Sequence, residues 1–449
     1  MNASNLHYDC LGIGIGPSNL SLACLLDPIK KLNYCFLEQK PTFIWHEGLL
    51  LEDASVQISI LKDLVSLVNP RSEYSFLSFL HEKNRLYHFI NADFTRAKRT
   101  EFNQYFQWAC SKLKYLKFSH KVKGVAFNGD FQIETEQGLF QAKNIVIGVG
   151  QVPHIPPFAK KVNHPTVFHA SELLTKQWAL KDKRIAVIGG GQSGAEVFST
   201  ILSSPKIEAP SKCLWMSRRS NFFPLDESPF CNEFFMPIYS EYFNKLPDRI
   251  KKHKLKEQNL INNGISLDTI RHIYQAIYQN AFLSKKPISI KLLAGREALD
   301  IDARGNSWKL TAKHMDTGEY EAFEADIIVL ATGYRYEIPN FLSPIRSRLQ
   351  IQDEELVIRD DFSARWDGPD HHRIYIQNNA IGQKGIADPN LSLIAWRSAK
   401  IINSLMNQQV YKDQNIQSFI SWGGGSSQKN SPVPFDLPCS ITSGDTVVL

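Results

Sequence analysis

Two glycine-rich turns carry the clearest chemical signal in this sequence. The first, GIGIGP at 12–17, follows the strand-like segment 7–11, and the second, GGGQSG at 189–194, follows the apolar run 184–188. A turn of this kind lets the backbone approach a pyrophosphate closely and points the first amides of the next helix at its charge. Each turn lies between an expected strand and an expected helix, so the sequence predicts two bound dinucleotides.

The side chains that end the following strand differ between the two turns. The strand 34–37 ends at Glu38, whose carboxylate can accept hydrogen bonds from a ribose diol. The strand 213–216 instead ends at Ser217, Arg218 and Arg219, and two guanidiniums suit the 2′-phosphate of NADP(H). We therefore predict FAD at the first turn and NADP(H) at the second. The alternative for the two arginines is a solvated surface pair.

These turns and strand ends give two sets of expected cofactor contacts. For FAD they are Gly12, Gly14, Gly16, Pro17 and Glu38. For NADP(H) they are Gly189, Gly191, Gln192, Ser193, Gly194, Ser217, Arg218 and Arg219. Pro17 stands in place of the third glycine of the usual fingerprint, and Ser193 could also cap its helix, a role compatible with binding.

Length and composition place the chain among globular proteins of two or three domains. It has 449 residues, and its formal net charge of +6 forms no basic tract, which fits phosphate-rich cofactors better than nucleic acid. No apolar run approaches the roughly 20 residues that span a bilayer, and no signal sequence is evident. The seven cysteines are scattered and no cluster has metal-ligand spacing, so we expect a cytoplasmic protein without a metal.

The order of the expected elements predicts an α/β fold. It comprises two Rossmann-like dinucleotide-binding domains, for FAD and NADPH, with a small helical substrate-binding subdomain. We place the FAD-binding domain at 1–163 and 323–413, the inserted NADPH-binding domain at 164–322, and the helical subdomain at about 222–278. A low-complexity tail at 414–449 is expected to be disordered.

The chain is expected to return to the first domain at the strand 325–330, which precedes Ala331, Thr332 and Gly333. This segment is similar to the return segment of flavoprotein monooxygenases and disulfide reductases, where the glycine lies against the flavin or the interdomain linker. Disulfide reductases need a redox CxxxxC or CxxC pair, which this chain lacks. Baeyer–Villiger enzymes and flavin monooxygenases of xenobiotics carry FxGxxxHxxxW/Y, of which 167–173 keeps only FHA. Of the enzyme classes compared, only the N-hydroxylating monooxygenases are left.

Several further stretches resemble the lysine and ornithine N-hydroxylases of siderophore biosynthesis. They are 57–65 with Asn69-Pro70 and 74–76, 99–105 with Trp108-Ala109, and 226–230 with Asn232-Glu233. The late run 385–393, with Ala395-Trp396-Arg397-Ser398, is particularly similar to the lysine branch. The resemblance extends from about Asp9 to Asn407, and the C-terminal tail has no counterpart.

This resemblance implies that a neutral terminal amine attacks a C4a-hydroperoxyflavin without an acid–base triad. It also implies that Gln57 lies near the reactive edge of the isoalloxazine, and that Lys62 binds the substrate's α-carboxylate with help from Asn232. A lysine is a point charge suited to a carboxylate, and an amide can add a hydrogen bond. The alternatives are a solvated lysine after an apolar strand for Lys62 and a half-buried strand position for Gln57.

The expected flavin site also includes Trp45, His46, Gly333, Asn390, Leu391 and Ser392. For His46 a hydrogen-bonded structural role is favoured over that of a base. Asn262 is a catalytic candidate, because ornithine enzymes carry a TNYS-type stretch near the flavin and substrate where this chain has 261–266.

Lys384 lies in GQKG at 382–385, where the family often has THG. Pointing inward, it would be a second substrate-binding cation. Two cations would disfavour a putrescine-like dication and favour a carboxylate, or a neutral head such as the imidazole of histamine. Pointing outward, it would carry no information. We predict L-lysine N6-hydroxylation for siderophore biosynthesis, with ornithine, cadaverine, putrescine and histamine left open.

Two other classes of function remain open from the sequence. One is an NADPH oxidase or redox-sensing flavoprotein that hydroxylates nothing, and the other is a nucleotide-binding scaffold without turnover. The expected partners are a small primary amine and dioxygen, with no nucleic acid and no integral membrane segment. Family resemblance suggests a homo-oligomer, either a dimer or a tetramer.

Overall fold

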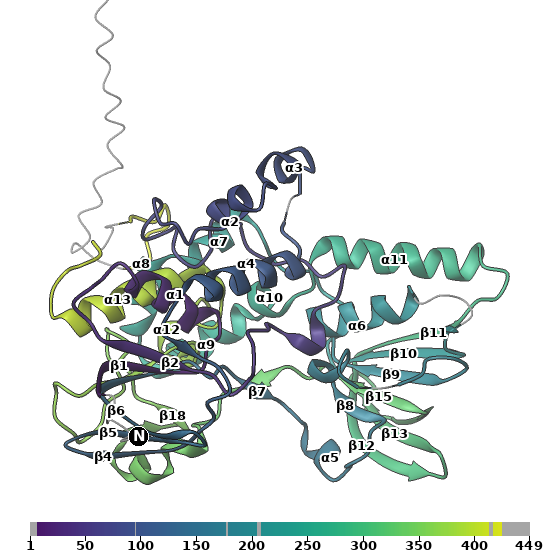
Figure 1. The fold of residues 1–449 in the computed structure, drawn as a ribbon. Coiled ribbons are helices and arrows are strands. Elements are labelled where there is room, and N and C mark those ends of the chain that lie inside the picture. The colour runs from purple at the N-terminus through teal and green to yellow at the C-terminus, as the bar shows by residue number, and fades with distance from the viewer. Residues whose placement is uncertain (1–6, 95, 177, 204–207, 413–415, 424–449) are drawn as a thin grey trace, which may run out of the picture.

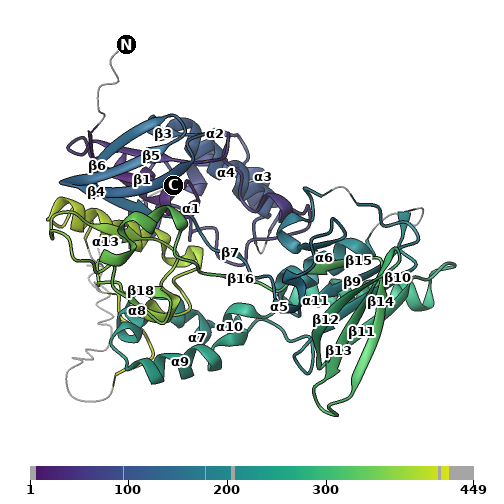
Figure 2. The ribbon, with the colours of Figure 1, turned by 90° about the horizontal axis from the view of Figure 1, so that it is seen from below.

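The computed structural model describes residues 7–94, 96–176, 178–203, 208–412 and 416–423. They form two lobes, each built on a β-sheet, and Figure 1 shows the lobes side by side. A group of short helices lies below the first lobe and beside the second in the view of Figure 2.

The first lobe contains a mixed seven-stranded sheet in the order β3-β2-β1-β6-β5-β4, with β19 paired to β6. The strands are β1 His7–Ile13, β2 Tyr34–Leu37, β3 Leu116–Lys117, β4 Val122–Asn128, β5 Asp130–Thr135, β6 Gly138–Ile147 and β19 Ile374–Ile376. Neighbours β2, β1, β6 and β19 run parallel, so their carboxyl ends meet at one edge. The last residues of each of these strands are buried, as expected for a sheet that is covered on both faces.

Four helices pack in the core of the first lobe: α1 Pro17–Leu26, α2 Phe76–Glu82, α4 Arg99–Lys112 and α13 Ile394–Met406. The lobe also contains α3 Leu86–Asn91, which packs against α2, and the short helix α12 Ile381–Lys384. Helix α1 contacts both α4 and α13, although α13 comes more than 350 residues later. The lobe also holds the hairpin β17 Ile351–Gln352 and β18 Glu355–Leu356 and the 3-10 helices η1 Glu47–Leu49, η5 Asn340–Arg348 and η6 Leu391–Leu393.

The second lobe contains a five-stranded parallel sheet in the order β11-β10-β9-β15-β8. Its strands are β8 Val167–His169, β9 Arg184–Ile188, β10 Lys212–Ser217, β11 Ser289–Ala294 and β15 Ile327–Leu330. An antiparallel sheet packs on it, formed by β12 Arg296–Arg304, β13 Ser307–His314 and β14 Tyr320–Ala325. The lobe's helices are α5 Pro157–Lys160, α6 Gln192–Leu202, α11 Leu267–Phe282 and the 3-10 helix η2 Ala170–Glu172.

The strand that we expected to return to the first domain lies in the second sheet instead. Strand β15 pairs in parallel with β9 and with β8. Its apolar residues therefore complete the second core, and the chain leaves this lobe only after Ala331. The predicted boundary at 322/323 is wrong at this strand, because an apolar strand followed by glycine fits either sheet.

The predicted helical subdomain is divided between two places. Most of it forms the group of short helices below the first lobe in Figure 2. This group consists of α7 Pro229–Asn232, the 3-10 helix η4 Glu233–Phe235, α8 Pro237–Asn244, α9 Asp248–Glu257 and α10 Asn259–Asn263. Helix α11, in contrast, packs against α6 through its apolar stripe Ile270, Ile273 and Ile277. The spacing of these isoleucines puts them on one helix face, which covers the second sheet.

The two connections between the lobes run side by side. Strand β7 Val152–Pro153 carries the chain into the second lobe and pairs antiparallel with β16 Tyr334–Arg335, which carries it back. The Gly333 carbonyl accepts hydrogen bonds from the His154 N–H at 2.9 Å and from His169 Nε2 at 3.0 Å. Gly333, at φ +82°, therefore lies in this double linker.

Part of the predicted tail is ordered against the helical group. The Trp422 ring is tilted against the Phe234 ring and edge-on to the Tyr239 ring, with ring centroids 5.1 and 4.7 Å apart, respectively. Ser418 donates a hydrogen bond to Glu233 at 2.6 Å. The prediction of disorder is thus wrong for 416–423, because these aromatic contacts order that segment. Residues 413–415 and 424–449 lie outside the described part of the chain.

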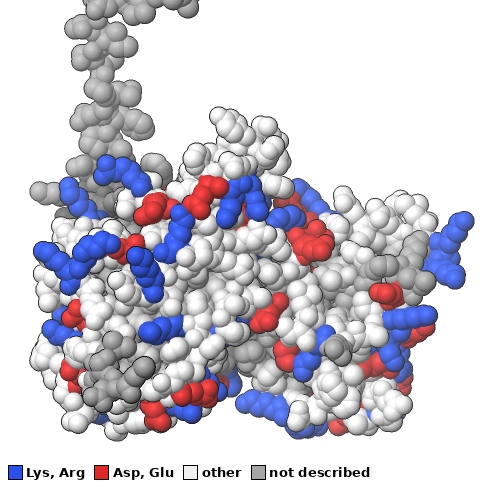
Figure 3. Space-filling model, in the orientation of Figure 1, with Lys and Arg blue, Asp and Glu red and all other residues white. Residues whose placement is uncertain are grey.

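Charged side chains of both signs are interspersed on the face drawn in Figure 3. Neither sign forms a continuous area there, which agrees with the absence of a basic tract in the sequence. Within the described ranges, no helix is both long enough and apolar enough to cross a membrane.

Candidate active site

The first glycine turn opens the carboxyl edge of the first sheet. Gly14 has φ +86°, and a Cβ atom at this position would lie 2.7 Å from the Gly148 carbonyl oxygen. Gly16 is the N-cap of α1, no side chain caps this end, and Pro17 occupies the first turn, where its missing N–H costs nothing. The turn therefore keeps free amides and open space for the predicted FAD pyrophosphate.

Glu38 lies at the end of β2 beside this turn. Its carboxylate accepts hydrogen bonds from the Ile15 N–H at 2.8 Å and from the Lys40 N–H at 3.0 Å. A carboxylate offers about four acceptor positions, so these two bonds leave room for a ribose diol. The geometry thus suits the predicted role of Glu38, and the chain's own residues fit a bound FAD.

The second turn has the same plan. Gly189, at φ +135°, lies so close to Ala331 that a Cβ would be 2.0 Å from its carbonyl oxygen. Gly191 is the N-cap of α6, without a side-chain cap, so Ser193 does not cap this helix in the structure. Ser217 is buried beneath Gly190. The first amides of α6 remain available to a phosphate.

The two arginines after β10 differ in their surroundings. The Arg219 guanidinium donates to the carbonyls of Asn263 at 3.0 Å and Gly190 at 3.4 Å, so it lies across the turn. Arg218 is exposed, and no hydrogen bond or ion pair joins it to another described side chain. Arg219 shapes the turn while Arg218 keeps a free guanidinium.

Replacing Arg218 by alanine is expected to reduce discrimination between the two nicotinamide cofactors. A lost charged hydrogen bond to the 2′-phosphate, worth about 1.5–3 kcal/mol, would raise KM for NADPH by about one to two orders of magnitude. The KM for NADH should stay nearly unchanged. Arg219→Ala should raise both, because it also loosens the turn. Initial-rate measurements with both cofactors check this, and a wild type that used NADH equally well would contradict it.

The late run is tied to α1 by a buried network. Arg397 and Asp388 form an ion pair at 2.8 Å, and both side chains are 1% exposed. Arg397 also donates to Ser18 Oγ at 3.0 Å and to Gln377 Oε1 at 3.0 Å. Two residues after Asp388, the Asn390 side chain accepts a hydrogen bond from the Ser392 N–H at 2.8 Å. Sequence reasoning missed the roles of Arg397 and Gln377, since nothing local pairs them with Ser18.

Gln57 and Lys62 lie on one irregular segment between Ala54 and Ser66, so the expected strand is absent there. Gln57 is half-buried, and its Nε2 has no partner among the described residues. The buried carboxylate of Asp63 accepts from the backbone N–H groups of Val65, Ser66 and Phe76, which fixes the segment. Sequence reasoning missed Asp63 as the residue that orders this segment.

Lys62 is half-buried and faces the helical group. Its Nζ lies 5.7 Å from the ring centroid of Phe235, three residues after Asn232. Burial lowers the pKa of Lys62 below its ordinary value. The structure thus brings Lys62 to the segment that carries Asn232, whose own side chain is exposed.

Asn262 and Lys384 lie apart from that contact. Asn262 is half-buried in α10, and the next carbonyl, that of Asn263, is bonded to Arg219, so this end of α10 adjoins the second turn. Lys384 points inward and is 4% exposed, with its ammonium 3.6 Å from Asp360. Lys62 is not among the residues that line the cavity around Lys384.

The surroundings of Lys384 form a cavity of about 220 Å³ between α8 and α13. Its lining is Ser240, Glu241, Lys245, Asp360, Lys384, Trp396 and Lys400. Burial lowers the pKa of Lys384. Its predicted role in substrate binding stays a prediction.

Trp45 and His46 adjoin each other, with ring centroids 4.8 Å apart. His46 has a left-handed backbone, φ +51°, and its ring makes no hydrogen bond to a described residue. His46 is an exposed residue, yet protein atoms around its imidazole, with Arg99 and Lys40, lower its pKa to about 4. A neutral imidazole of this pKa is a poor base near neutral pH.

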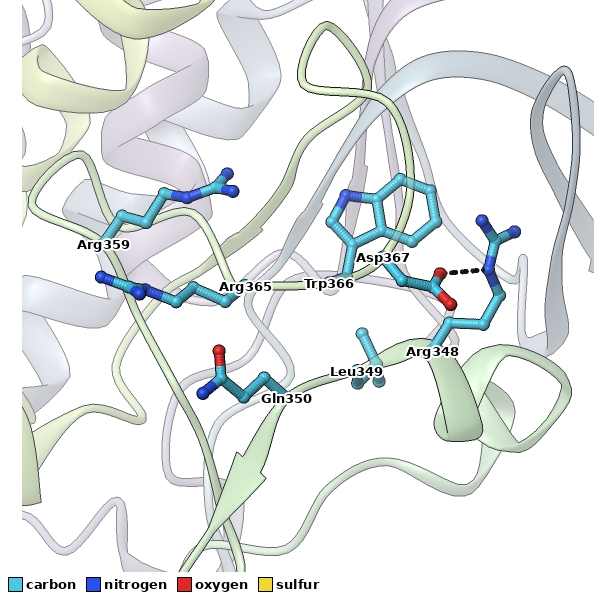
Figure 4. A pocket seen from close by; sticks show the side chains of 7 residues that line it. All are labelled: Arg348, Leu349, Gln350, Arg359, Arg365, Trp366 and Asp367. Carbon is cyan, nitrogen blue, oxygen red and sulfur yellow. Dashed lines mark hydrogen bonds and ion pairs between the residues drawn. The ribbon is translucent and has the colours of Figure 1, made fainter.

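A separate cavity of about 470 Å³ lies on the first lobe (Figure 4). Arg348, Arg359 and Arg365 line it around Trp366, and Arg348 pairs with Asp367 at 2.6 Å. None of the predicted site residues lines it. Within the described ranges, no group of three or more His, Cys, Asp or Glu side chains is placed to hold a metal.

Similarity to known proteins extends over most of the chain. Residues 6–336 match the family described as L-lysine 6-monooxygenase/L-ornithine 5-monooxygenase. The chain is also 37% identical over 422 residues to the L-lysine N6-monooxygenase of Escherichia coli, covering 93% of this chain and 99% of that protein. The chain belongs to this family. Its enzyme class is therefore a flavin-dependent N-hydroxylating monooxygenase, and it hydroxylates an amine in siderophore biosynthesis.

Two solved structures share the fold and contain its cofactors. One is the FAD-bound cadaverine monooxygenase of desferrioxamine biosynthesis from Erwinia amylovora, with TM-score 0.88, 28% identity and coverage of 94% of this chain and 100% of that one. The other is an ornithine N-hydroxylase of Kutzneria with reduced FAD, NADP⁺ and L-ornithine, with TM-score 0.82, 26% identity and coverage of 89% and 99%. The predicted fold class is confirmed, and the enzyme's cofactors are FAD and NADPH.

Proposed function

We propose that the enzyme hydroxylates the terminal nitrogen of L-lysine. The observation that carries the proposal is the half-buried ammonium of Lys62, which lies against Phe235 on the segment that holds Asn232. A partly desolvated cation attracts a carboxylate more strongly than an exposed one does. An amino acid offers that carboxylate, whereas a diamine would bring a second positive charge to Lys62.

The similarity to the Escherichia coli enzyme supports lysine as the amino acid. FAD, reduced by NADPH, supplies the activation of dioxygen when it is bound. The chain's own residues then have three tasks. Lys62 and Asn232 would hold the carboxylate, Gln57 would offer its unpartnered Nε2 near the reaction, and the half-buried Phe235 would limit water.

We also infer which cofactor each lobe binds. The first lobe, with α1 and the late run, would bind FAD, and the second lobe, with α6, would bind NADPH. Helices α7 to α10 would cover the amine. A cytoplasmic location stays a prediction, supported by free thiols at all cysteines in the described ranges.

A coupling experiment with a panel of amines tests the proposal. Hydroxylamine formed per NADPH consumed is measured with L-lysine, L-ornithine, cadaverine, putrescine and histamine. We expect lysine to give the highest kcat/KM and a ratio near one. A higher kcat/KM with a decarboxylated amine would refute the substrate assignment. NADPH oxidation without hydroxylamine from any amine would favour an oxidase.

A further inference from the structure

The two lobes meet at a largely buried ion pair between a helix of the first lobe and a helix of the second. Arg99 begins α4, and Glu196 lies in α6. Their side chains form two bonds, of 2.9 and 3.1 Å, and are only 13% and 6% exposed. A bidentate guanidinium–carboxylate pair fixes orientation as well as distance, and breaking a buried pair leaves an uncompensated charge.

On the side of the first lobe, Arg99 holds two segments that carry predicted flavin-site residues. Its guanidinium donates to the Leu49 carbonyl at 2.7 Å, three residues after His46. Its backbone N–H donates to the Ala54 carbonyl at 2.8 Å, three residues before Gln57. A shift of Arg99 would therefore move both segments.

On the side of the second lobe, Glu196 lies one helical turn after the start of α6. Gln192, a predicted NADPH contact, donates through Nε2 to Glu196 at 3.0 Å. The side-chain oxygen Oε1 of Gln192 accepts a hydrogen bond from the Ser266 N–H at 2.8 Å. The same carboxylate thus orients the N-terminal end of α6, where the phosphates are expected.

A second contact beside the ion pair keeps the lobes close. A Cβ at Gly48 would lie 1.8 Å from the Ser171 carbonyl oxygen, and the Leu174 N–H donates to the Gly48 carbonyl at 3.1 Å. Leu49 and Leu51 bury their side chains in the apolar cluster of the second lobe. The segment after His46 is therefore anchored across the boundary.

We propose that Arg99 and Glu196 are positioning residues for hydride transfer. In that step NADPH would give up a hydride with both electrons of the broken C–H bond, and the oxidised flavin would accept it in a new bond to hydrogen, so that NADPH would become NADP⁺ and FAD would be reduced. The two rings must approach to about 3–3.5 Å in the right orientation. The ion pair sets the placement of α6 against the flavin segments. This role of the ion pair rests on the proposed function, which assigns FAD to the first lobe and NADPH to the second.

The test is anaerobic reduction of the holoenzyme by saturating NADPH, with the loss of oxidised-flavin absorbance recorded by stopped flow. Arg99→Met and Glu196→Gln are expected to lower the limiting rate of flavin reduction by about 10- to 100-fold, as a misplacement of about 1 Å would. FAD content and the dissociation constant for NADP⁺ should stay within about threefold of wild type. Arg99→Lys keeps the charge and should recover part of the rate.

Arg296→Met is the matched control, because it breaks the Arg296–Glu321 pair, 3.0 Å long, inside the antiparallel sheet. It should reduce flavin at the wild-type rate. Limiting rates within twofold of wild type in both Arg99→Met and Glu196→Gln would overturn the proposal. So would a Glu196→Gln or Arg99→Lys protein that had lost FAD, since the pair would then serve folding. The assay contains no amine, so a failure to hydroxylate lysine would leave this result unaffected.

Discussion

Gly14→Val is expected to yield protein that purifies without FAD. A β-branched side chain is strained at φ +86°, and its Cβ would lie 2.7 Å from the Gly148 carbonyl oxygen. Because those neighbours are backbone atoms, the clash would displace the turn that is expected to hold the pyrophosphate. The ratio of flavin absorbance to protein absorbance after purification measures the effect, and circular dichroism reports whether the fold survives.

Gly191→Val is the matched variant in the second turn. Gly191 has φ −104°, and a Cβ there would meet the Asn263 carbonyl oxygen at 3.5 Å, an ordinary contact. We expect a folded, yellow protein whose KM for NADPH rises at least about tenfold, or about 1.4 kcal/mol. If Gly191→Val lost the flavin and Gly14→Val kept it, the order of the two cofactor sites would be reversed.

Lys62→Ala is expected to raise KM for L-lysine by about one to two orders of magnitude. The charged hydrogen bond to the substrate carboxylate is worth about 1.5–3 kcal/mol, which sets this range. Reduction of the flavin by NADPH should be nearly unchanged, because Lys62 lies on the segment of the first lobe that faces the helical group. Steady-state kinetics with lysine, and flavin reduction without amine, separate the two steps.

Two comparisons make the Lys62 result decisive. Lys121→Ala removes an exposed lysine of the same lobe and should leave KM for lysine unchanged. With cadaverine, which lacks the carboxylate, Lys62→Ala should matter little or should help, because a cation near a cationic ligand is removed. An equal loss with lysine and cadaverine would refute carboxylate binding by Lys62 and leave the enzyme class intact.

Local sequence determined the elements that hold the cofactors. The strands expected at 184–188 and 34–37 are β9 and β2 with the same bounds, and 213–216 is extended by one residue at each end in β10. These strands are short, apolar and followed by glycine or a charged strand end, so pattern and turn chemistry suffice to place them. The enzyme class also followed from the sequence, since its motifs are contiguous stretches.

The tertiary structure decided which elements meet. An apolar strand such as β15 is compatible with either sheet. The amphipathic pattern of α11 predicts that one of its faces is buried, but it does not predict which element covers that face. The pairs Arg99–Glu196 and Arg397–Ser18 join residues 97 and 379 positions apart. No local pattern encodes such contacts, because they depend on how the two lobes and the last helix pack, and that packing fixes the geometry around both cofactors.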